Sequence, residues 1–111
     1  MALYFTTTQP AQLLARYKKM IDDKEVETWS YDQDGDFTHT PDQWRNKAWL
    51  RPVIETGRLA FYVIKPNGVN ISTTVYSVYH GRFIESMLAH CDTLFTVGQA
   101  TALPAASDKV A

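Results

Sequence analysis

The run from Asp32 to His39 carries the densest set of reactive side chains in this sequence. Carboxylates alternate at Asp32, Asp34 and Asp36, and an imidazole ends the run at His39. Carboxylates that alternate around a tight loop can bind a hard cation, and an imidazole near a carboxylate can transfer protons. The residue types therefore suggest two chemistries for this run, cation binding and acid–base catalysis.

Cation binding has little support from the surrounding residues. The three aspartates match the first, third and fifth positions of an EF-hand calcium loop, but Phe37 occupies the position that requires glycine. Gln43 stands where that loop requires a bidentate glutamate. The pair Asp34-Gly35 is also a favourable hairpin turn, because aspartate tolerates turn geometry and glycine has no side chain to clash. We therefore predict a structural turn and no metal site.

Acid–base catalysis would rest on His39, which Asp36 and Asp42 flank in the sequence and can orient. A small hydrolase- or isomerase-like enzyme that uses Asp32, Asp36 and His39 is the alternative hypothesis for this chain. No nucleophile accompanies these residues: the G-x-S-x-G elbow is absent, and Cys91 falls on the apolar stripe of a predicted helix. The scattered glycines form no phosphate-binding loop, so we predict no cofactor.

Aromatic side chains near this run favour a different role, that of a contact surface. Tyrosine and tryptophan are enriched at interfaces because they combine a large contact area with a polar group. The alternative is that these rings line the core. We predict that a partner or ligand contacts Trp29, Tyr31, Asp34, Trp44 and Tyr76.

Composition limits the classes of partner. The chain has 111 residues, 45% of them hydrophobic, and a formal net charge of -1. Nucleic acid is an unlikely partner because lysine and arginine are neither in excess nor concentrated. Cys91 is the single cysteine, and the sequence shows neither a basic leader before an apolar block nor an apolar run that could span a bilayer. We therefore expect a cytoplasmic domain of bacterial type without a membrane partner.

The spacing of apolar residues predicts two helices. Residues 10–24 place leucine, tyrosine, methionine and isoleucine at helical spacing, with Thr8 as the expected cap and Pro10 in the first turn. The second helix is expected to start at Ser77 or His80 and to end at His90.

Short segments with alternating or continuous apolar residues predict strands. The clearest pair is a hairpin in which residues 59–64 turn at residues 66–68 and return as residues 69–75. The other candidate segments are residues 2–6, 26–31, 37–39, 49–55 and 93–97.

Together these elements predict an α+β fold: a single antiparallel β-sheet of about five strands with two α-helices packed on one face. We expect residues 1–100 to form one domain and residues 101–111 a loose tail. The second sheet face is expected to carry Trp29 and Tyr31 and to remain open. The leading hypothesis is non-catalytic binding through this aromatic face, either to a second copy of the chain as a homodimer or to another protein or small molecule.

Overall fold

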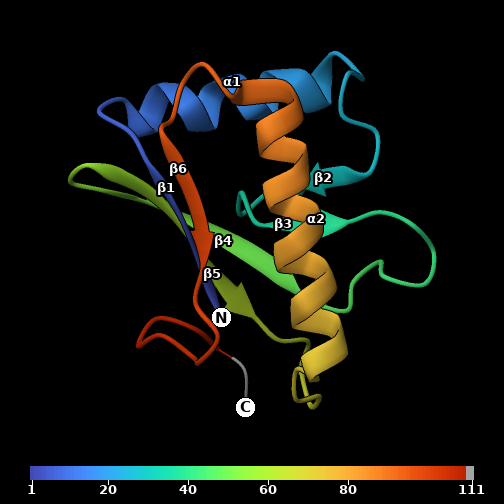
Figure 1. The fold of residues 1–111 in the computed structure, drawn as a ribbon. Helices are drawn as coiled ribbons and strands as arrows, with labels where there is room; N and C mark the ends of the chain where they lie inside the picture. The colour runs from blue at the N-terminus through green and yellow to red at the C-terminus, as the bar shows by residue number, and fades with distance from the viewer. Residues whose placement is uncertain (110–111) are drawn as a thin grey trace.

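A six-stranded antiparallel sheet with two helices on one face forms the framework of the molecule, which confirms the predicted α+β fold (Figure 1). The computed structural model describes residues 1–109. The strands lie in the order β2-β3-β4-β5-β1-β6. Within the described residues, neither helix is long and apolar enough to cross a membrane. The elements in chain order are β1 (Ala2–Thr6), α1 (Pro10–Asp22), β2 (Trp29–Tyr31), β3 (Phe37–His39), β4 (Trp49–Glu55), β5 (Arg58–Ile64), α2 (Thr73–Cys91) and β6 (Val97–Ala100).

The core lies between the sheet and the two helices, and Phe83 of α2 is at its centre. Its ring centroid is between 4.7 and 6.1 Å from five other aromatic rings, which come from α1 and four strands. Each of these side chains is almost completely buried, and burial of one such side chain stabilises the fold by roughly 1.5–3 kcal/mol. The five partners are Phe5, Tyr17, Trp29, Phe37 and Phe61.

The start of α1 differs from the prediction. Gln9 occupies the N-cap position and makes no side-chain capping bond, whereas Thr8 was expected to cap. The hydroxyl of Thr7 accepts a hydrogen bond from the Gln9 amide at 3.0 Å and orders the residues before the helix. Pro10 lies in the first turn as predicted, where its missing amide hydrogen costs nothing.

The predicted return strand at residues 69–75 is wrong. Residues 69–72 are irregular, and α2 already begins at Thr73 with Ser72 as its N-cap. The physical reason is the sheet order: β5 pairs with β4 on one side and with β1 on the other, so neither of its edges is free for a hairpin partner. The last strand is also shifted, from the predicted residues 93–97 to Val97–Ala100.

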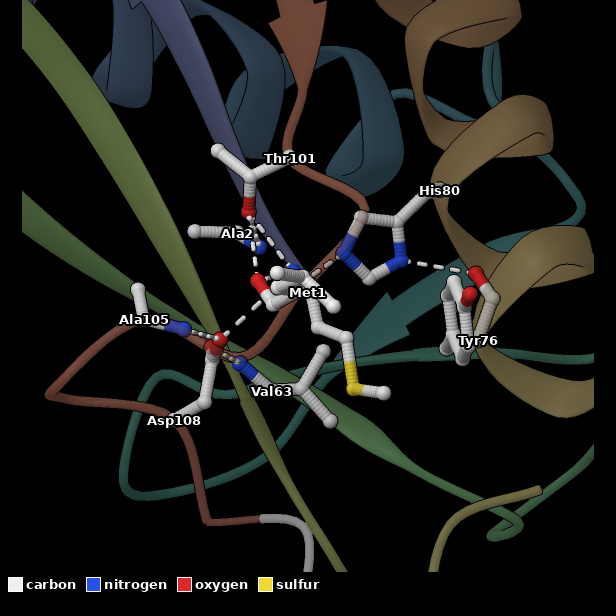
Figure 2. A network of polar contacts seen from close by, with 9 residues as sticks. Met1, Ala2, Val63, Tyr76, His80, Thr101, Ala105 and Asp108 are labelled. Carbon is white, nitrogen blue, oxygen red and sulfur yellow. Dashed lines mark hydrogen bonds and ion pairs between the residues drawn. The ribbon is translucent and has the colours of Figure 1, made fainter. Parts of the chain in front are cut away.

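Residues 101–109 lie against the first residues of β1 and the end of β5 (Figure 2). The Asp108 carboxylate accepts hydrogen bonds from the amides of Val63 at 2.8 Å and Ala105 at 2.6 Å. Lys109 continues this contact as a parallel bridge to Ile64. The predicted loose tail thus has specific contacts up to Lys109, and its residues 110–111 lie outside the described residues.

Candidate functional site

The sheet face opposite the helices carries a set of charged and aromatic side chains, which we call the open face. Side chains alternate along a strand, so the neighbours of core residues point to this side. The small apolar cluster on this face contains Ala2, Ala60 and Tyr62; Tyr4 and Ala105 pack against it, and neither helix contributes a residue. The residues that define the open face are Tyr4, Asp36, Arg51, Val53, Glu55, Arg58 and Tyr62.

Four of these side chains form one connected group. Glu55 accepts hydrogen bonds from Arg58 Nε at 2.6 Å and from the Tyr62 hydroxyl at 2.7 Å, one on each carboxylate oxygen. The Arg58 guanidinium lies 3.8 Å from the centroid of the Tyr4 ring, within the range of a cation–π contact. The hydrogen bond from Tyr62, together with Arg58, lowers the pKa of Glu55. Glu55 is therefore ionised at neutral pH and holds Arg58 and Tyr62 in place through its two oxygens.

A second ion pair on the open face joins Asp36 to Arg51. Arg51 Nε donates to Asp36 Oδ1 at 3.0 Å and Arg51 Nη2 donates to Asp36 Oδ2 at 2.8 Å, which is the bidentate geometry of a strong guanidinium–carboxylate contact. The Asp36 side chain is 6% exposed and that of Arg51 is 51% exposed. The hydrogen bond to Asp36 raises the pKa of Arg51.

The turn that the sequence predicted is held by the carboxylate of Asp32. Asp32 Oδ1 accepts hydrogen bonds from the amides of Asp34 and Asp36, each at 3.0 Å. Gly35 has a φ of 83°, a conformation that favours glycine. Oxygen atoms of Asp32, Asp34 and Asp36 lie within 4.8 Å of one another, but Asp32 holds the turn and Asp36 binds Arg51.

His39 does not join these carboxylates. Asp36 immediately precedes β3 and His39 is its last residue; because side chains alternate along an extended chain, Asp36 reaches the open face while His39 lies on the helix side. His39 Nδ1 is 2.7 Å from the carbonyl oxygen of Thr28, and the ring lies against Trp29 with centroids 4.5 Å apart. Burial lowers the pKa of His39. The structure therefore places His39 and Asp36 on opposite sides of the sheet, and a catalytic role for Asp32, Asp36 and His39 stays a prediction.

His39 instead lines a cavity of about 300 Å³ between the start of the β2–β3 hairpin and α2. The residues around this cavity are Thr28, His39, Pro41, Arg82, Glu85, Ser86, Ala89 and His90. A larger cavity of about 420 Å³ lies at residues 6–9 and 93–96. Its lining is mostly threonine and carries no ionisable side chain, so the smaller cavity has the richer chemistry.

The aromatic residues predicted as contacts lie elsewhere than expected. Trp29 is 2% exposed and packs in the core, because the register that pairs Phe37 with Leu50 turns Trp29 and Tyr31 toward the helices. The Tyr31 hydroxyl donates to Asp22 of α1 at 2.7 Å. The placement of Trp29 and Tyr31 on the open face is therefore wrong.

Trp44 and Tyr76 are half-buried. The carbonyl oxygen of Trp44 accepts a hydrogen bond from the Tyr79 hydroxyl, and the Tyr76 ring packs edge-on against His80 at 5.8 Å. Asp34 is exposed at the tip of the turn. A binding role for these three residues stays a prediction.

Sequence reasoning missed the residues that occupy the open face. Tyr62 lies in the continuous apolar run of residues 59–64, and such a run does not indicate which side chains face away from the core. Arg51, Val53 and Glu55 alternate with Leu50, Pro52 and Ile54 along β4, and this alternation was the available signal for a strand with one polar face.

No protein-family model matches the chain, and neither a curated protein nor a solved structure is detectably similar to it. The function is therefore argued from the geometry of the two regions above.

Proposed function

We propose that this protein is a non-catalytic binding domain that self-associates into a homodimer through the open face. The proposal rests on the group of Tyr4, Glu55, Arg58 and Tyr62, which hydrogen bonds and a cation–π contact hold together. Neither helix contributes a residue to the apolar cluster on this face of the sheet. Arginine and tyrosine are the side chains that dominate binding energy at protein interfaces.

The fixed geometry of this group favours binding. A side chain that becomes immobile on association loses about 0.5–1.5 kcal/mol of conformational entropy. Hydrogen bonds to both oxygens of Glu55 already restrain Arg58 and Tyr62 in the single chain. These two side chains therefore lose less conformational entropy on association. Val53 adds an exposed apolar side chain beside the group.

The charge pattern favours a second copy of the chain as the partner. Two arginines and two carboxylates alternate on the open face, so its formal charge is balanced. A twofold interface brings one patch against the same patch of the partner, and such a patch must be self-complementary. A balanced patch can place arginine opposite carboxylate, whereas a patch of one sign would repel itself.

The enzyme hypothesis for residues 32–39 has less geometric support. Asp36 is paired with Arg51 on one side of the sheet, and His39 contacts the Thr28 carbonyl oxygen on the other. Neither of the two cavities described above is lined by Asp32, Asp34 or Asp36.

Light scattering coupled to gel filtration over a range of micromolar concentrations tests the proposal. We expect the mass of two chains at the upper end of the range and a shift toward one chain on dilution. High salt should promote dissociation, because it screens charge pairs at the rim of an interface. A mass of one chain at every concentration would overturn the homodimer and leave a different protein or a small molecule as the partner to seek.

A further inference from the structure

We propose that the cavity between His39 and α2 binds a small zwitterion that carries one carboxylate and one ammonium group, the chemistry of a free amino acid. This site lies on the helix side of the sheet and is independent of the open face.

The first argument is an unpaired acceptor atom on the largely buried ring of His39. A carbonyl oxygen can only accept a hydrogen bond, so the 2.7 Å contact with Thr28 places the ring proton on Nδ1 and leaves a lone pair on Nε2. His39 is 4% exposed. Within residues 1–109, Nε2 makes no hydrogen bond, yet it is not sealed from solvent. Nε2 is therefore free to accept a hydrogen bond from a donor in the cavity.

The second argument is a pair of exposed, opposite charges that form no ion pair with each other. Arg82 and Glu85 both line the cavity and are three residues apart on α2, a spacing at which ion pairs commonly form. Among the ion pairs of the described residues, none involves Arg82 or Glu85. Both charges nevertheless lie close enough to His39 to affect its pKa in opposite directions.

A zwitterion satisfies these groups together. Its carboxylate would pair with Arg82, and its ammonium group would donate to Glu85 and to His39 Nε2. A simple anion would face the Glu85 carboxylate, and a simple cation would face the Arg82 guanidinium, so each would meet a like charge. The ligand is therefore expected to carry both charges.

The size and the remaining lining residues agree with a small ligand. A volume of about 300 Å³ is at the lower end for binding pockets, which suits a molecule of a few heavy atoms. The Ser86 hydroxyl lies 2.7 Å from the Tyr17 hydroxyl, which fixes that wall of the cavity. A metal ion is disfavoured, because the described residues bring three potential ligand groups within 4.8 Å of one another only at Asp32, Asp34 and Asp36.

Nuclear magnetic resonance of the imidazole signals tests this proposal in the intact chain. The chain has 3 histidines, so the signals of His39 and His90 can be compared with that of the distant His80. Glycine, L-alanine and L-serine serve as probes. Sodium acetate and methylammonium chloride, used at equal ionic strength, carry the carboxylate half and the ammonium half of the zwitterion separately. We expect saturable shifts of His39 and His90 with at least one amino acid, and no saturation with either half over the same range.

Two variants test which side chain of the cavity binds each charge of the ligand. Arg82→Gln and Glu85→Gln should each weaken amino-acid binding by about tenfold or more, because each leaves one charge of the ligand unpaired. Arg45→Gln and Glu25→Gln remove exposed charges outside the cavity and should leave the affinity unchanged. Unchanged amide spectra would show that the variants keep the fold.

Three results would overturn the proposal. They are the absence of any saturable shift up to about 50 mM amino acid, equal binding of acetate alone, and full affinity in both Arg82→Gln and Glu85→Gln.

Discussion

The Asp36 carboxylate shows how one side chain links the turn to the sheet. It is 6% exposed and binds Arg51 through both oxygens, while its own amide is held by Asp32. A buried carboxylate that loses its cationic partner is left without compensation for its lost hydration, which is unfavourable.

We predict that Arg51→Met lowers the free energy of unfolding by about 1–2 kcal/mol, a range that allows for the half-exposed guanidinium. Arg45, whose ion pair with Asp42 is 3.2 Å long and exposed, provides the control. Arg45→Met should change stability by less than about 0.5 kcal/mol. Urea unfolding of both variants at low protein concentration measures the difference, and equal losses would contradict a structural role for the Asp36 pair.

Two buried histidines are expected to make the fold sensitive to mild acid. Burial lowers the pKa of both His39 and His80. His80 Nδ1 is 2.7 Å from Tyr76 O and Nε2 is 2.5 Å from Met1 O (Figure 2); these two contacts raise the pKa of His80, but burial lowers it by more. A histidine with a lowered pKa in the folded chain binds fewer protons than the unfolded chain does, so its stabilising contribution is present above the unfolded pKa and is lost as pH falls.

The expected result is a melting temperature that falls between pH 7.5 and 5.5, a window around the unfolded histidine pKa of about 6.5 in which carboxylates stay ionised. His39→Asn, which retains a side-chain donor for Thr28 O but does not titrate, should reduce this fall. Thermal unfolding monitored by circular dichroism checks both points. A constant melting temperature, or histidine signals that titrate above 6.5, would contradict the prediction.

At this scale the sequence predicted the turn but not the partners of its residues. Asp34-Gly35 signals a hairpin by local conformational preference alone. The direction of His39 depends on the register between β3 and β4, where one pair, Phe37 with Leu50, sets which side chains face the core. A shift of one residue would exchange the two faces, and no local pattern in three residues fixes that choice.

At the scale of elements, the start of α2 shows a conflict between local preference and sheet topology. Residues 69–75 alternate like a strand, but β4 and β1 already occupy both edges of β5. The chain instead enters a helix at Thr73, and the Ser72 hydroxyl accepts a hydrogen bond from the Val75 amide at 3.2 Å. The occupied edges could not be predicted because the β1–β5 pairing joins segments far apart in the sequence.

Ser72→Ala should destabilise the protein by about 1 kcal/mol, the usual cost of the loss of an N-cap side chain. Ser77 is the matched control, since its hydroxyl donates to Thr74 O within the same helix and caps nothing. Ser77→Ala should be neutral or slightly stabilising. Denaturant unfolding of the two variants measures the comparison, and equal destabilisation would argue against Ser72 as the start of the helix.

Residues 101–109, which follow β6, provide a second test at the scale of elements. Asp108 accepts hydrogen bonds from Val63 and Ala105 and thereby holds residues 101–109 against β5. Asp108→Ala should accelerate hydrogen exchange at the Val63 amide and lower stability by about 1–3 kcal/mol, because two part-buried amides lose their acceptor. Ser107→Ala changes an exposed neighbour and should do neither. Unchanged exchange at Val63 in Asp108→Ala would favour the loose tail that the sequence predicted.

At the scale of the whole molecule, the sheet separates two surfaces with different proposed roles. The spacing of apolar residues predicted the α+β class and the packing of the helices on one face of the sheet. The reason is that the apolar stripes of the helices and the apolar faces of the strands must share a core. The open face was predicted to exist but was assigned the wrong residues, since its composition follows from the pairing of β4, β5 and β1. That pairing places Tyr4, Arg58 and Tyr62 together.

Val53 and Ile54 of β4 provide the matched pair that tests the central proposal. They are adjacent and exposed, at 36% and 54%, but point to opposite sides of the sheet: Val53 pairs with Ala60 of the open face and Ile54 with Leu59 of the core side. A glutamate at position 53 would bring like charges together across a twofold interface, whereas one at position 54 would face solvent.

Sedimentation equilibrium of Val53→Glu and Ile54→Glu beside the unchanged chain is the most direct measurement. The proposal predicts that the unchanged chain and Ile54→Glu form dimers of similar affinity, while Val53→Glu dimerises at least about tenfold more weakly. A dimer that Val53→Glu leaves intact, or that Ile54→Glu weakens equally, would contradict association through the open face.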